Sequence, residues 1–543
     1  MNKVIKILLA GFALLNLGLL GGFQIKNTLP GSGMTNIDSG LRKLQNTFLF
    51  IENNYVESPQ HNKLIDDAIK GIMEGLDPHS FYIPATEMAQ MQEQMGGSFE
   101  GIGVQFDILD DTIYVETPLS GGPSEKLGIM AGDRIVTVDG ETVAGIGITN
   151  ADVTKYLKGP KGTTVNVGIH RRGEKELLEF AIVRDKIPIN SVEHSYMIRE
   201  DIGYIRVTRF AETTYMEFKQ HLKQLIAQGM KGLVLDLRSN PGGYMVMANK
   251  MADEFLPAGK LIVSTEGRIS QSKQEYHSTS SIGSFEEGAV VVLIDYGSAS
   301  ASEIVSGALQ DHDRGLIIGV RSFGKGLVQI QEEFDDGSAI RLVISKYYTP
   351  SGRCIQKPYD KSSEDYNKDI TQRFESGEIF DQEKIQLPDS LKYTTSSGRT
   401  VYGGGGIYPD IFVADDTTGS SKYLMNLRIN DLFREFSFKY VDNRPELKNR
   451  YASVDAFVKG FRVTDELVRQ FTAFAEEKGV TYSPAGFEQA ERRIVNRIKA
   501  YIGRRLLNDE AFYPVYHELD NVIQEAIKLM PEAKTLEQTG NLD

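Results

Sequence analysis

The run Ala289-Val-Val-Val-Leu-Ile294 is apolar at every position and leads through Asp-Tyr into Gly297-Ser-Ala-Ser-Ala-Ser-Glu-Ile304. An unbroken apolar run of this length is typical of a strand that is buried on both faces. Three further runs share this character, at 202–207, 232–237 and 315–320. Helical patterns lie between them, at 216–228 and 302–309. Strands that alternate with helices predict an α/β layered core over residues 187–350.

The chain on either side of this core has a different character. Residues 35–95 carry apolar side chains at helical spacing, and Gly75 with Asp77-Pro78 ends the second of two predicted helices. Short alternating apolar runs between glycines follow, and they predict a β-rich module at 96–186 with strands at 103–109, 112–115, 134–138, 164–170 and 177–183. The polar stretch 359–395 is expected to be a surface excursion.

The region from about 421 onward is again helical in pattern. Thr464 is placed to cap a helix that presents Leu467 and Phe471 on one face and ends at Gly479. This tail has three possible roles, namely packing on the core, forming a dimer interface and binding an adaptor. Taken together, the patterns predict a multidomain α+β protein.

Composition narrows the class of function. The chain has 543 residues, a formal net charge of -14 and 41% hydrophobic residues, which is ordinary for a globular protein of several domains. Its acidity disfavours a nucleic-acid partner, because phosphate backbones would be repelled. Cys354 is the single cysteine, and the eight histidines are scattered. We therefore expect no disulfide within the chain, no metal site and no cofactor.

The first residues resemble an export signal. Lys3 and Lys6 precede an uncharged run at 7–23, and Lys26 follows it. This run is long for a signal peptide and slightly short for a membrane-spanning helix, so residues 1–25 are either a signal peptide or an inner-membrane anchor. We expect an exported, periplasmic protein, and whether the segment is cleaved stays open.

Two elements have the residue types that catalysis requires. In the first, the small residues 297–302 leave a serine at the start of a helix, where free N–H groups can bind an oxyanion. The alternative is that these serines only cap the helix. In the second, Gly324-Lys325-Gly326 follows a buried strand. Desolvation there would lower the pKa of the lysine and make it a usable base, whereas the alternative is an ordinary solvated lysine.

The chain resembles the C-terminal processing peptidases, also called tail-specific proteases. The resemblance rests on motifs that occur in family order: Gly71-Ile-Met-Glu-Gly-Leu-Asp-Pro-His79, Phe99-Glu-Gly-Ile-Gly-Val104, Leu235-Asp-Leu-Arg-Ser-Asn-Pro-Gly-Gly243, Ser298-Ala-Ser-Ala-Ser-Glu-Ile304 with Gln310-Asp311, Phe323-Gly-Lys-Gly326 with Gln329, and Gly405-Gly-Ile-Tyr-Pro-Asp410. Each motif is weak alone, but the set is highly specific.

The resemblance implies a serine protease core with layers like those of crotonases and Clp protease. It assigns Ser300 as the nucleophile, Lys325 as the general base and Gln329 as the residue that orients the lysine. Ser298 and Ser302 become structural neighbours, with Ser302 as the helix cap.

The resemblance also suggests the groups that support the reaction. The oxyanion would be bound by the Ala301 N–H and by a glycine N–H from Gly242 or Gly243, of which Gly242 is favoured. Asp311 matches a family aspartate near the site, with a supporting or structural role.

The module at 96–186 resembles a bacterial PDZ domain. Its loop Gly101-Ile102-Gly103-Val104 is then expected to bind the terminal carboxylate of a peptide, which would add as a strand beside Val104 to Phe106. Protein or peptide substrates with free C-termini are the expected partners.

These inferences divide the chain into a signal or anchor at 1–25, a helical segment at 35–95, a PDZ domain at 96–186, a Ser-Lys peptidase core at 187–420 and a helical extension at 421–543. The extension could support self-association or bind an adaptor. The expected function is that of an exported endopeptidase that processes or degrades envelope proteins.

Three hypotheses compete with the Ser-Lys assignment. Ser322-x-x-Lys325 matches the pattern of penicillin-recognising enzymes, but the flanking glycines disfavour the helix that this chemistry needs. A Ser-His-Asp site would use His312, but this residue is more simply explained as part of the polar end of a helix. A catalytically silent PDZ scaffold would be expected to lack Ser300 or Lys325, and both are present.

Overall fold

The computed structural model describes residues 34–542 apart from 120, 280, 282, 360–362, 386 and 388. The predicted signal or anchor at 1–25 lies outside the described residues. Contacts divide the chain into two units, 1–72 and 73–543. Among the described helices, none combines the length and the apolar content that crossing a bilayer requires.

The two helices predicted near the N-terminus are present, and the boundary between the units falls within the last turn of the second. Helix α2 spans Met34–Asn54 and α3 spans His61–Glu74. Helix α3 ends one residue before Gly75, as expected for a helix that meets a glycine and then a proline.

The second unit is built on a six-stranded sheet in the order β10-β11-β12-β15-β16-β21. All neighbouring pairs are parallel except the first, in which β10 is antiparallel to β11. The four apolar runs are confirmed as its central strands. The bounds are β10 (Val192–Met197), β11 (Ile202–Val207), β12 (Gly232–Asp236), β15 (Ala289–Ile294), β16 (Leu316–Gly319) and β21 (Ile411–Phe412).

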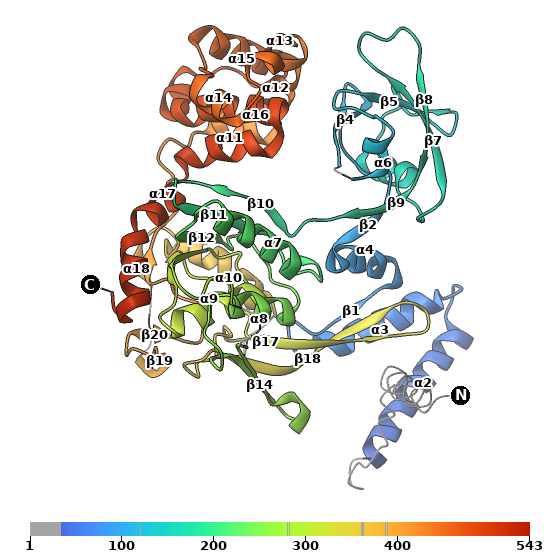
Figure 1. The fold of residues 1–543 in the computed structure, drawn as a ribbon. Helices are drawn as coiled ribbons and strands as arrows, with labels where there is room; N and C mark the ends of the chain where they lie inside the picture. Colours follow the sequence, from blue (N-terminus) through green and yellow to red (C-terminus); the bar gives the residue numbers. More distant parts are fainter. Residues whose placement is uncertain are drawn as a thin grey trace, which may run out of the picture. The chain divides into compact units, whose positions relative to one another are not determined.

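One face of this sheet is covered by three helices, α7 (Thr214–Ala227), α8 (Met245–Asp253) and α9 (Ala301–Asp311) (Figure 1). Alternate strand residues such as Leu235 and Val292 point into this layer, where they are fully buried. The helix predicted over 302–309 lies within α9, which extends beyond it at both ends.

The other face is covered by the end of the chain. Helices α17 (Asn521–Lys528) and α18 (Met530–Thr539) pack on the intervening strand residues, including Val291 and Leu293 (Figure 1). Of the three roles open for the tail, packing on the core is thus observed for these two helices. The expected boundary at residue 420 does not separate them from the core, because they supply one of its layers.

A second sheet adjoins the first. Its strands run in the order β1-β18-β13-β14, and β17 pairs with β18. The bounds are β1 (Phe81–Ile83), β13 (Leu261–Gly267), β14 (Gln274–His277), β17 (Leu327–Glu333) and β18 (Ala339–Tyr348). The hairpin β17–β18 follows the Gly-Lys-Gly element directly, so it determines where the lysine lies.

The polar stretch at 359–395 is not wholly a surface excursion as predicted. It contains α10 (Ser363–Ser376), two short 3-10 turns at Gln382–Lys384 and Asp389–Leu391, and β19 (Lys392–Thr394), which pairs with β20 (Thr400–Tyr402). Tyr366 and Arg373 of α10 are 5% and 3% exposed. Ile379 and Thr395 are also buried, and the pattern missed these positions because most of the segment is polar.

The β-rich module contains the five predicted strands in the order β3-β4-β5-β7-β8, with β3 at one edge. Helix α4 and the antiparallel pair β2 and β9 join the module to the core. The bounds are α4 (Ala85–Gly96), β2 (Ser98–Gly101), β3 (Val104–Leu109), β4 (Thr112–Pro118), α5 (Pro123–Lys126), β5 (Arg134–Val138), β6 (Glu141–Thr142), α6 (Asn150–Leu157), β7 (Thr164–His170), β8 (Leu178–Val183) and β9 (Asp185–Pro188).

Six helices between the core and α17 form a hydrophobic core of their own, and we refer to residues 422–516 as the tail domain. Thr464 caps α15 as predicted, because its Oγ1 accepts from the Leu467 N–H at 3.3 Å. The bounds are α11 (Lys422–Ile429), α12 (Leu432–Asp442), α13 (Glu446–Arg450), α14 (Val454–Gly460), α15 (Asp465–Glu477) and α16 (Pro484–Tyr516).

The packing of α17 on the sheet predicts that the end of the chain is needed for core stability. Ile523 is 0% exposed within this layer, so Ile523→Ala removes buried apolar surface and leaves a cavity. We expect a loss of about 2–5 kcal/mol in the free energy of unfolding, measured by urea denaturation followed by circular dichroism. Lys528→Ala, at a side chain 70% exposed on the same helix, should change it by less than about 0.5 kcal/mol. Equal midpoints for the two variants would contradict this role.

Candidate active site

Three loops meet at the carboxyl ends of the central parallel strands. The loop after β12 carries Gly242 and Gly243, the loop after β15 carries Ser300, and the loop after β16 carries Lys325. This edge of a parallel sheet is where open α/β folds bind their ligands. The sheet therefore brings together residues that lie far apart in the sequence.

Ser300 occupies a sharp turn between β15 and α9. Its φ is 54° and its ψ is -111°, a conformation that is rare for a residue with a side chain. The turn is held on both sides, because the Ser300 N–H donates to Glu303 at 2.7 Å and its carbonyl accepts from Tyr347 Oη at 3.1 Å. Backbone strain of this kind is found at nucleophile turns, where it presents the side chain to the substrate.

The neighbouring serines have structural roles. Ser298 is buried and its Oγ donates to the Leu237 carbonyl at 2.8 Å. Ser302 was expected to cap the helix, but the N-cap position belongs to Ser300. Ser302 lies inside α9, and its Oγ donates to the Asn240 carbonyl at 3.0 Å.

Glu303 links the serine turn to the lysine loop. Its fully buried carboxylate accepts hydrogen bonds from the N–H groups of Ser300, Gly324 and Lys325 at 2.7–2.9 Å, and from Ser322 Oγ at 2.5 Å. Burial raises the pKa of Glu303, and the four donors act in the opposite direction. Sequence reasoning missed this residue, because a glutamate three positions into a helix is also what an ordinary capping box contains.

Lys325 lies in a partly buried position beside β17. Its Nζ donates to Gln329 Oε1 at 2.9 Å, and the Gln329 Nε2 donates in turn to the carbonyl of His79 at 2.5 Å. Burial lowers the pKa of Lys325, and the nearby positive charge of Arg341 lowers it further. Both effects favour the neutral amine, which is the form able to accept a proton.

The turn Asp77–Ser80 determines where the His79 carbonyl lies. The Asp77 carboxylate accepts from the N–H groups of His79 and Ser80, both at 2.8 Å, and from Ser80 Oγ at 2.7 Å. Ser80 Oγ also accepts from the N–H of Val343 in β18 at 3.0 Å. From the sequence, Asp77-Pro78 is interpreted as a helix stop. The contact between the His79 carbonyl and Gln329, 250 residues later, is visible only in the folded chain.

Helix α10 packs over the lysine loop. Arg373 donates to the Ser322 carbonyl at 2.7 Å, and Tyr366 Oη hydrogen-bonds His79 Nε2 at 2.6 Å. Lys357 Nζ lies 4.0 Å from the ring centres of both Phe323 and Tyr366. Burial and the charges of Lys325 and Lys357 lower the pKa of His79 to about 4, so its ring is neutral near pH 7.

The two residues of the predicted dyad, Ser300 and Lys325, do not contact each other directly. Both donate a backbone N–H to Glu303, which holds their loops side by side. Within the described residues, Lys325 Nζ donates to Gln329 and makes no hydrogen bond to Ser300 Oγ. Catalytic hydrogen bonds are often long in the absence of substrate and tighten when it binds.

The two candidate oxyanion glycines differ in what their N–H groups do. The Gly242 N–H donates to Asn240 Oδ1 at 2.9 Å, whereas no described group accepts from Gly243. Gly242 instead packs on the nucleophile turn, since a Cβ there would lie 2.8 Å from that of Ser300. At Ala301, the first residue of α9, the N–H also has no acceptor among the described residues.

Asp311 lies at the far end of α9, eleven residues and about 16 Å from Ser300. It forms a fully buried ion pair with Arg353 at 2.7 Å and accepts from the Ser351 N–H at 2.9 Å. Asp311 therefore anchors the loop after β18 and does not face the nucleophile.

The geometry disfavours both alternative catalytic sites. Ser322 is fully buried, donates to Glu303 and accepts from the Ile407 N–H, so it faces the interior. His312 lies at the far end of α9, and its Nε2 hydrogen-bonds the Leu261 carbonyl at 2.6 Å. Within the described residues, no three histidine, cysteine or carboxylate side chains gather as metal ligands.

The loop 101–104, predicted to bind a carboxylate, is held in place through its carbonyls. Gly103 has a φ of 73°, and its carbonyl accepts from the Leu119 N–H at 2.9 Å. The side chain of Ile102 is buried in the module, and its carbonyl accepts from Ser124 Oγ at 2.6 Å. Val104 begins the edge strand β3, so the strand beside this loop is open to β-addition.

Comparison with known proteins identifies families for four parts of the chain. Residues 201–365 match the model of Peptidase family S41, 101–182 match PDZ domain, 24–86 match the activating protease CtpB N-terminal domain, and 423–508 match a family of unknown function.

Among curated proteins, the carboxy-terminal-processing protease of Bartonella bacilliformis is 39% identical over 58% of this chain and 72% of its own length. The carboxy-terminal processing protease CtpA of Bacillus subtilis is 35% identical over 73% of this chain and 79% of its own. The solved photosystem II D1 C-terminal processing protease is 28% identical, covers 69% of this chain and 86% of its own, and has a TM-score of 0.35.

The fold and the matches define a serine protease that carries a PDZ domain. The chain belongs to peptidase family S41, as one of its carboxy-terminal processing proteases.

The position of Glu303 predicts that its charge is needed for activity although it is not part of the dyad. Glu303→Gln replaces one carboxylate oxygen with an amide N–H₂, which then faces two donors, either the Ser300 and Lys325 N–H groups or the Gly324 N–H and Ser322 Oγ. The serine turn and the lysine loop should therefore separate. A displacement of about 1 Å can reduce the rate about 100-fold, and we expect at least that loss in kcat/KM on an unfolded protein substrate.

Two controls accompany this variant. Ser322→Ala removes one donor to Glu303 and leaves its charge, so it should keep activity within about tenfold of wild type, given that a single hydrogen bond contributes about 1 kcal/mol. Circular dichroism should show that both variants are folded. A folded Glu303→Gln enzyme with wild-type kcat/KM would refute the role given to this residue.

Proposed function

We propose that this protein is an endopeptidase in which Ser300 is the nucleophile and Lys325 is the general base, oriented by Gln329. The observation that carries the proposal is the chain of contacts from Ser300 through Glu303 to the lysine loop, with Lys325 Nζ held at 2.9 Å from Gln329. Ser300 is partly accessible at the start of α9, as a nucleophile must be.

The reaction follows from these positions. Neutral Lys325 takes the proton from Ser300 Oγ as the oxygen attacks the scissile carbonyl carbon. The oxyanion is bound by the N–H groups of Ala301 and Gly243, the latter replacing Gly242 as our choice, because Gly242 already donates to Asn240. Protonated Lys325 then gives its proton to the leaving amine, which leaves an acyl-enzyme. Water, activated by the same lysine, releases the new C-terminus.

The PDZ module would select the substrates. The loop 101–104 and the open edge of β3 suit a peptide that ends in a free carboxylate and adds as an antiparallel strand. Lys158 at the end of α6 ties the module to the core, through a 2.6 Å ion pair with Glu93 of α4. A captured C-terminus is therefore held by a module that is attached to the catalytic unit.

We further propose that the protein is exported and acts on proteins of the cell envelope. The support is the uncharged run at 7–23 between Lys6 and Lys26. Residues 7–23 would serve either as a signal peptide or as an inner-membrane anchor.

The proposed base predicts a specific dependence of activity on pH. Below its pKa, Lys325 is an ammonium ion and accepts no proton, so kcat/KM should rise about tenfold per pH unit. It should level off at an apparent pKa below the ordinary 10.5 of lysine. Lys325→Arg keeps the positive charge but cannot act as a base, and it should be inactive at every pH up to about 11.

Two controls separate this mechanism from others. Ser300→Ala should be folded and inactive, and a metal chelator should leave the wild-type rate unchanged. A Ser300→Ala enzyme that cleaves at the wild-type rate, or a chelator effect that zinc reverses, would overturn the assignment.

The PDZ assignment predicts that binding depends on a free C-terminus. A hydrogen bond to a carboxylate contributes about 1.5–3 kcal/mol, and about 1.4 kcal/mol corresponds to a tenfold change in Kd. Amidating the terminus of a peptide substrate should therefore weaken its binding to Ser300→Ala protein at least tenfold, measured by fluorescence anisotropy. Acetylating the N-terminus of the same peptide should leave Kd unchanged. Equal Kd values for the acid and the amide would mean that the module does not read C-termini.

A further inference from the structure

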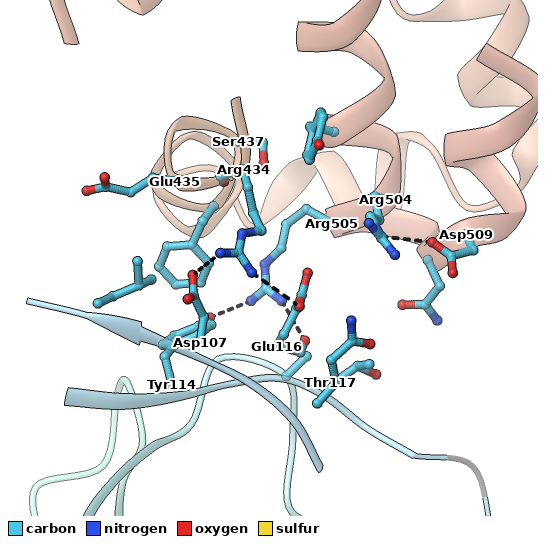
Figure 2. Close-up of a pocket in the computed structure, with 16 residues that line it drawn as sticks. Asp107, Tyr114, Glu116, Thr117, Arg434, Glu435, Ser437, Arg504, Arg505 and Asp509 are labelled. Atoms are coloured by element: carbon cyan, nitrogen blue, oxygen red, sulfur yellow. Dashed lines mark hydrogen bonds and ion pairs between the residues drawn. The ribbon is translucent and has the colours of Figure 1, made fainter. Parts of the chain in front are cut away.

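The tail domain, most of which matches a family of unknown function, lies against the PDZ module. The contact is made by α12 and α16 on one side and by the outer face of β3 and β4 on the other. Figure 2 shows Arg434 and Arg505 reaching from the helices toward Asp107, Tyr114 and Glu116 on the strands. This contact has no part in the catalytic site described above.

An aromatic pair forms the centre of the contact. The ring centres of Tyr114 and Phe438 lie 4.1 Å apart in an edge-to-face arrangement, and Tyr114 is 2% exposed. The Arg505 guanidinium lies 4.9 Å from the Phe438 ring centre and donates to Tyr114 Oη at 2.8 Å. Neither aromatic residue belongs to the hydrophobic core of its own domain, so the contact between the domains accounts for the burial of Tyr114.

Charged pairs surround this centre. Arg434 lies 3.1 Å from Asp107 and 4.0 Å from Glu116, and Arg172 of the module lies 3.2 Å from Asp442 of α12. Burial raises the pKa of Glu116, and the nearby arginines oppose the shift. Each domain supplies arginines to carboxylates of the other, so the two surfaces are complementary in charge.

The two surfaces are complementary in charge, but they are not completely packed against each other. A cavity of about 90 Å³ remains between the two surfaces, and the side chains of Arg434 and Asp107 are 34% and 24% exposed (Figure 2). Each domain has its own core. Because each domain packs independently, loss of the contact would release the domains without unfolding either one. Salt should weaken the ion pairs, since they are partly solvated.

The strand that the tail domain contacts is the one open to a peptide. Phe106 and Ile108 of β3 point into the PDZ core, whereas Asp107 between them points toward Arg434. Strand β3 is also the edge strand beside the loop 101–104. One strand thus carries the domain contact on its outer face and offers its free edge for peptide addition.

We propose that the tail domain is a docking platform for the PDZ module. It holds the outer face of β3 and β4 through Arg434, Arg505 and Phe438, and this keeps the peptide-binding strand in one position relative to the protease core. The consequence for cleavage rests on the proposed function, because a docked module would present a captured C-terminus to Ser300 in a defined direction.

The test measures the distance between the two domains in the full chain. Spin labels are attached at Glu179→Cys on β8 and Asp455→Cys on α14, both exposed, in a Cys354→Ser background that removes the native thiol. Double electron–electron resonance should give a single narrow distance distribution. Raising the salt from about 0.05 M to 0.5 M should broaden it, since the Debye length falls severalfold.

Charge reversal then identifies the contact. Arg434→Glu places a fourth carboxylate beside Asp107, Glu116 and Asp431, which also pairs with Arg434, and it should at least double the width of the distribution. The double variant Asp107→Arg/Arg434→Glu restores an opposite pair at the same place and should narrow it again. Arg469→Glu is the matched control, because Arg469 is on α15 of the same domain, is 69% exposed and pairs with Glu466 of its own helix.

Activity provides a second readout that separates this proposal from the proposed function. Arg434→Glu should lower kcat/KM at least fivefold for a protein with a free C-terminus and leave unchanged the cleavage of a short amidated peptide. If the enzyme cleaves nothing, the catalytic proposal fails, while the distance measurement still tests the docking. A broad distribution in the wild type, or a narrow one in Arg434→Glu, would overturn the docking proposal.

Discussion

The arrangement of the site depends on one buried carboxylate. Glu303 accepts four hydrogen bonds in a place without solvent, and the donors belong to two different loops. An unpaired charge in such a place would be strongly unfavourable, so the donors and the carboxylate hold one another in position. Because Ser300 and Lys325 supply two of those donors through their backbone, their separation is determined by Glu303 before any substrate binds.

The layers of the fold explain why these loops meet. Parallel strands place their carboxyl ends on one edge, and the burial of both sheet faces makes the strand positions rigid. The layer on the far face comes from α17 and α18 at the end of the chain, and the acceptor for Gln329 comes from the His79 carbonyl near its beginning. The candidate active site thus depends on segments from both ends of unit 73–543, while the PDZ module and the tail domain are joined to this unit's core as separately packed bodies.

Several features could be predicted from single stretches of sequence. The four buried strands, the five strands of the PDZ module and the capped helix at 465–477 all follow from local periodicity and capping, and the structure contains them. Roles that depend on a partner far away in the sequence could not be predicted in this way. The local pattern predicted that Ser302 caps a helix, but its hydroxyl donates a hydrogen bond to the Asn240 carbonyl. Gly242 could not be separated from Gly243 until the contact with Asn240 was known.

By itself, the sequence determined which elements form and which residues have the chemistry, because apolar spacing, glycines and family motifs are properties of short segments. It identified Ser300, Lys325 and Gln329 as candidates and the module at 96–186 as a PDZ domain. Only the tertiary structure decided what surrounds them. It placed Glu303 between two loops, Asp311 at the far end of α9, helix α10 over the lysine loop, and the tail domain against β3. Hydrogen bonds and burial join residues regardless of their separation along the chain, and that information exists only once the chain is folded.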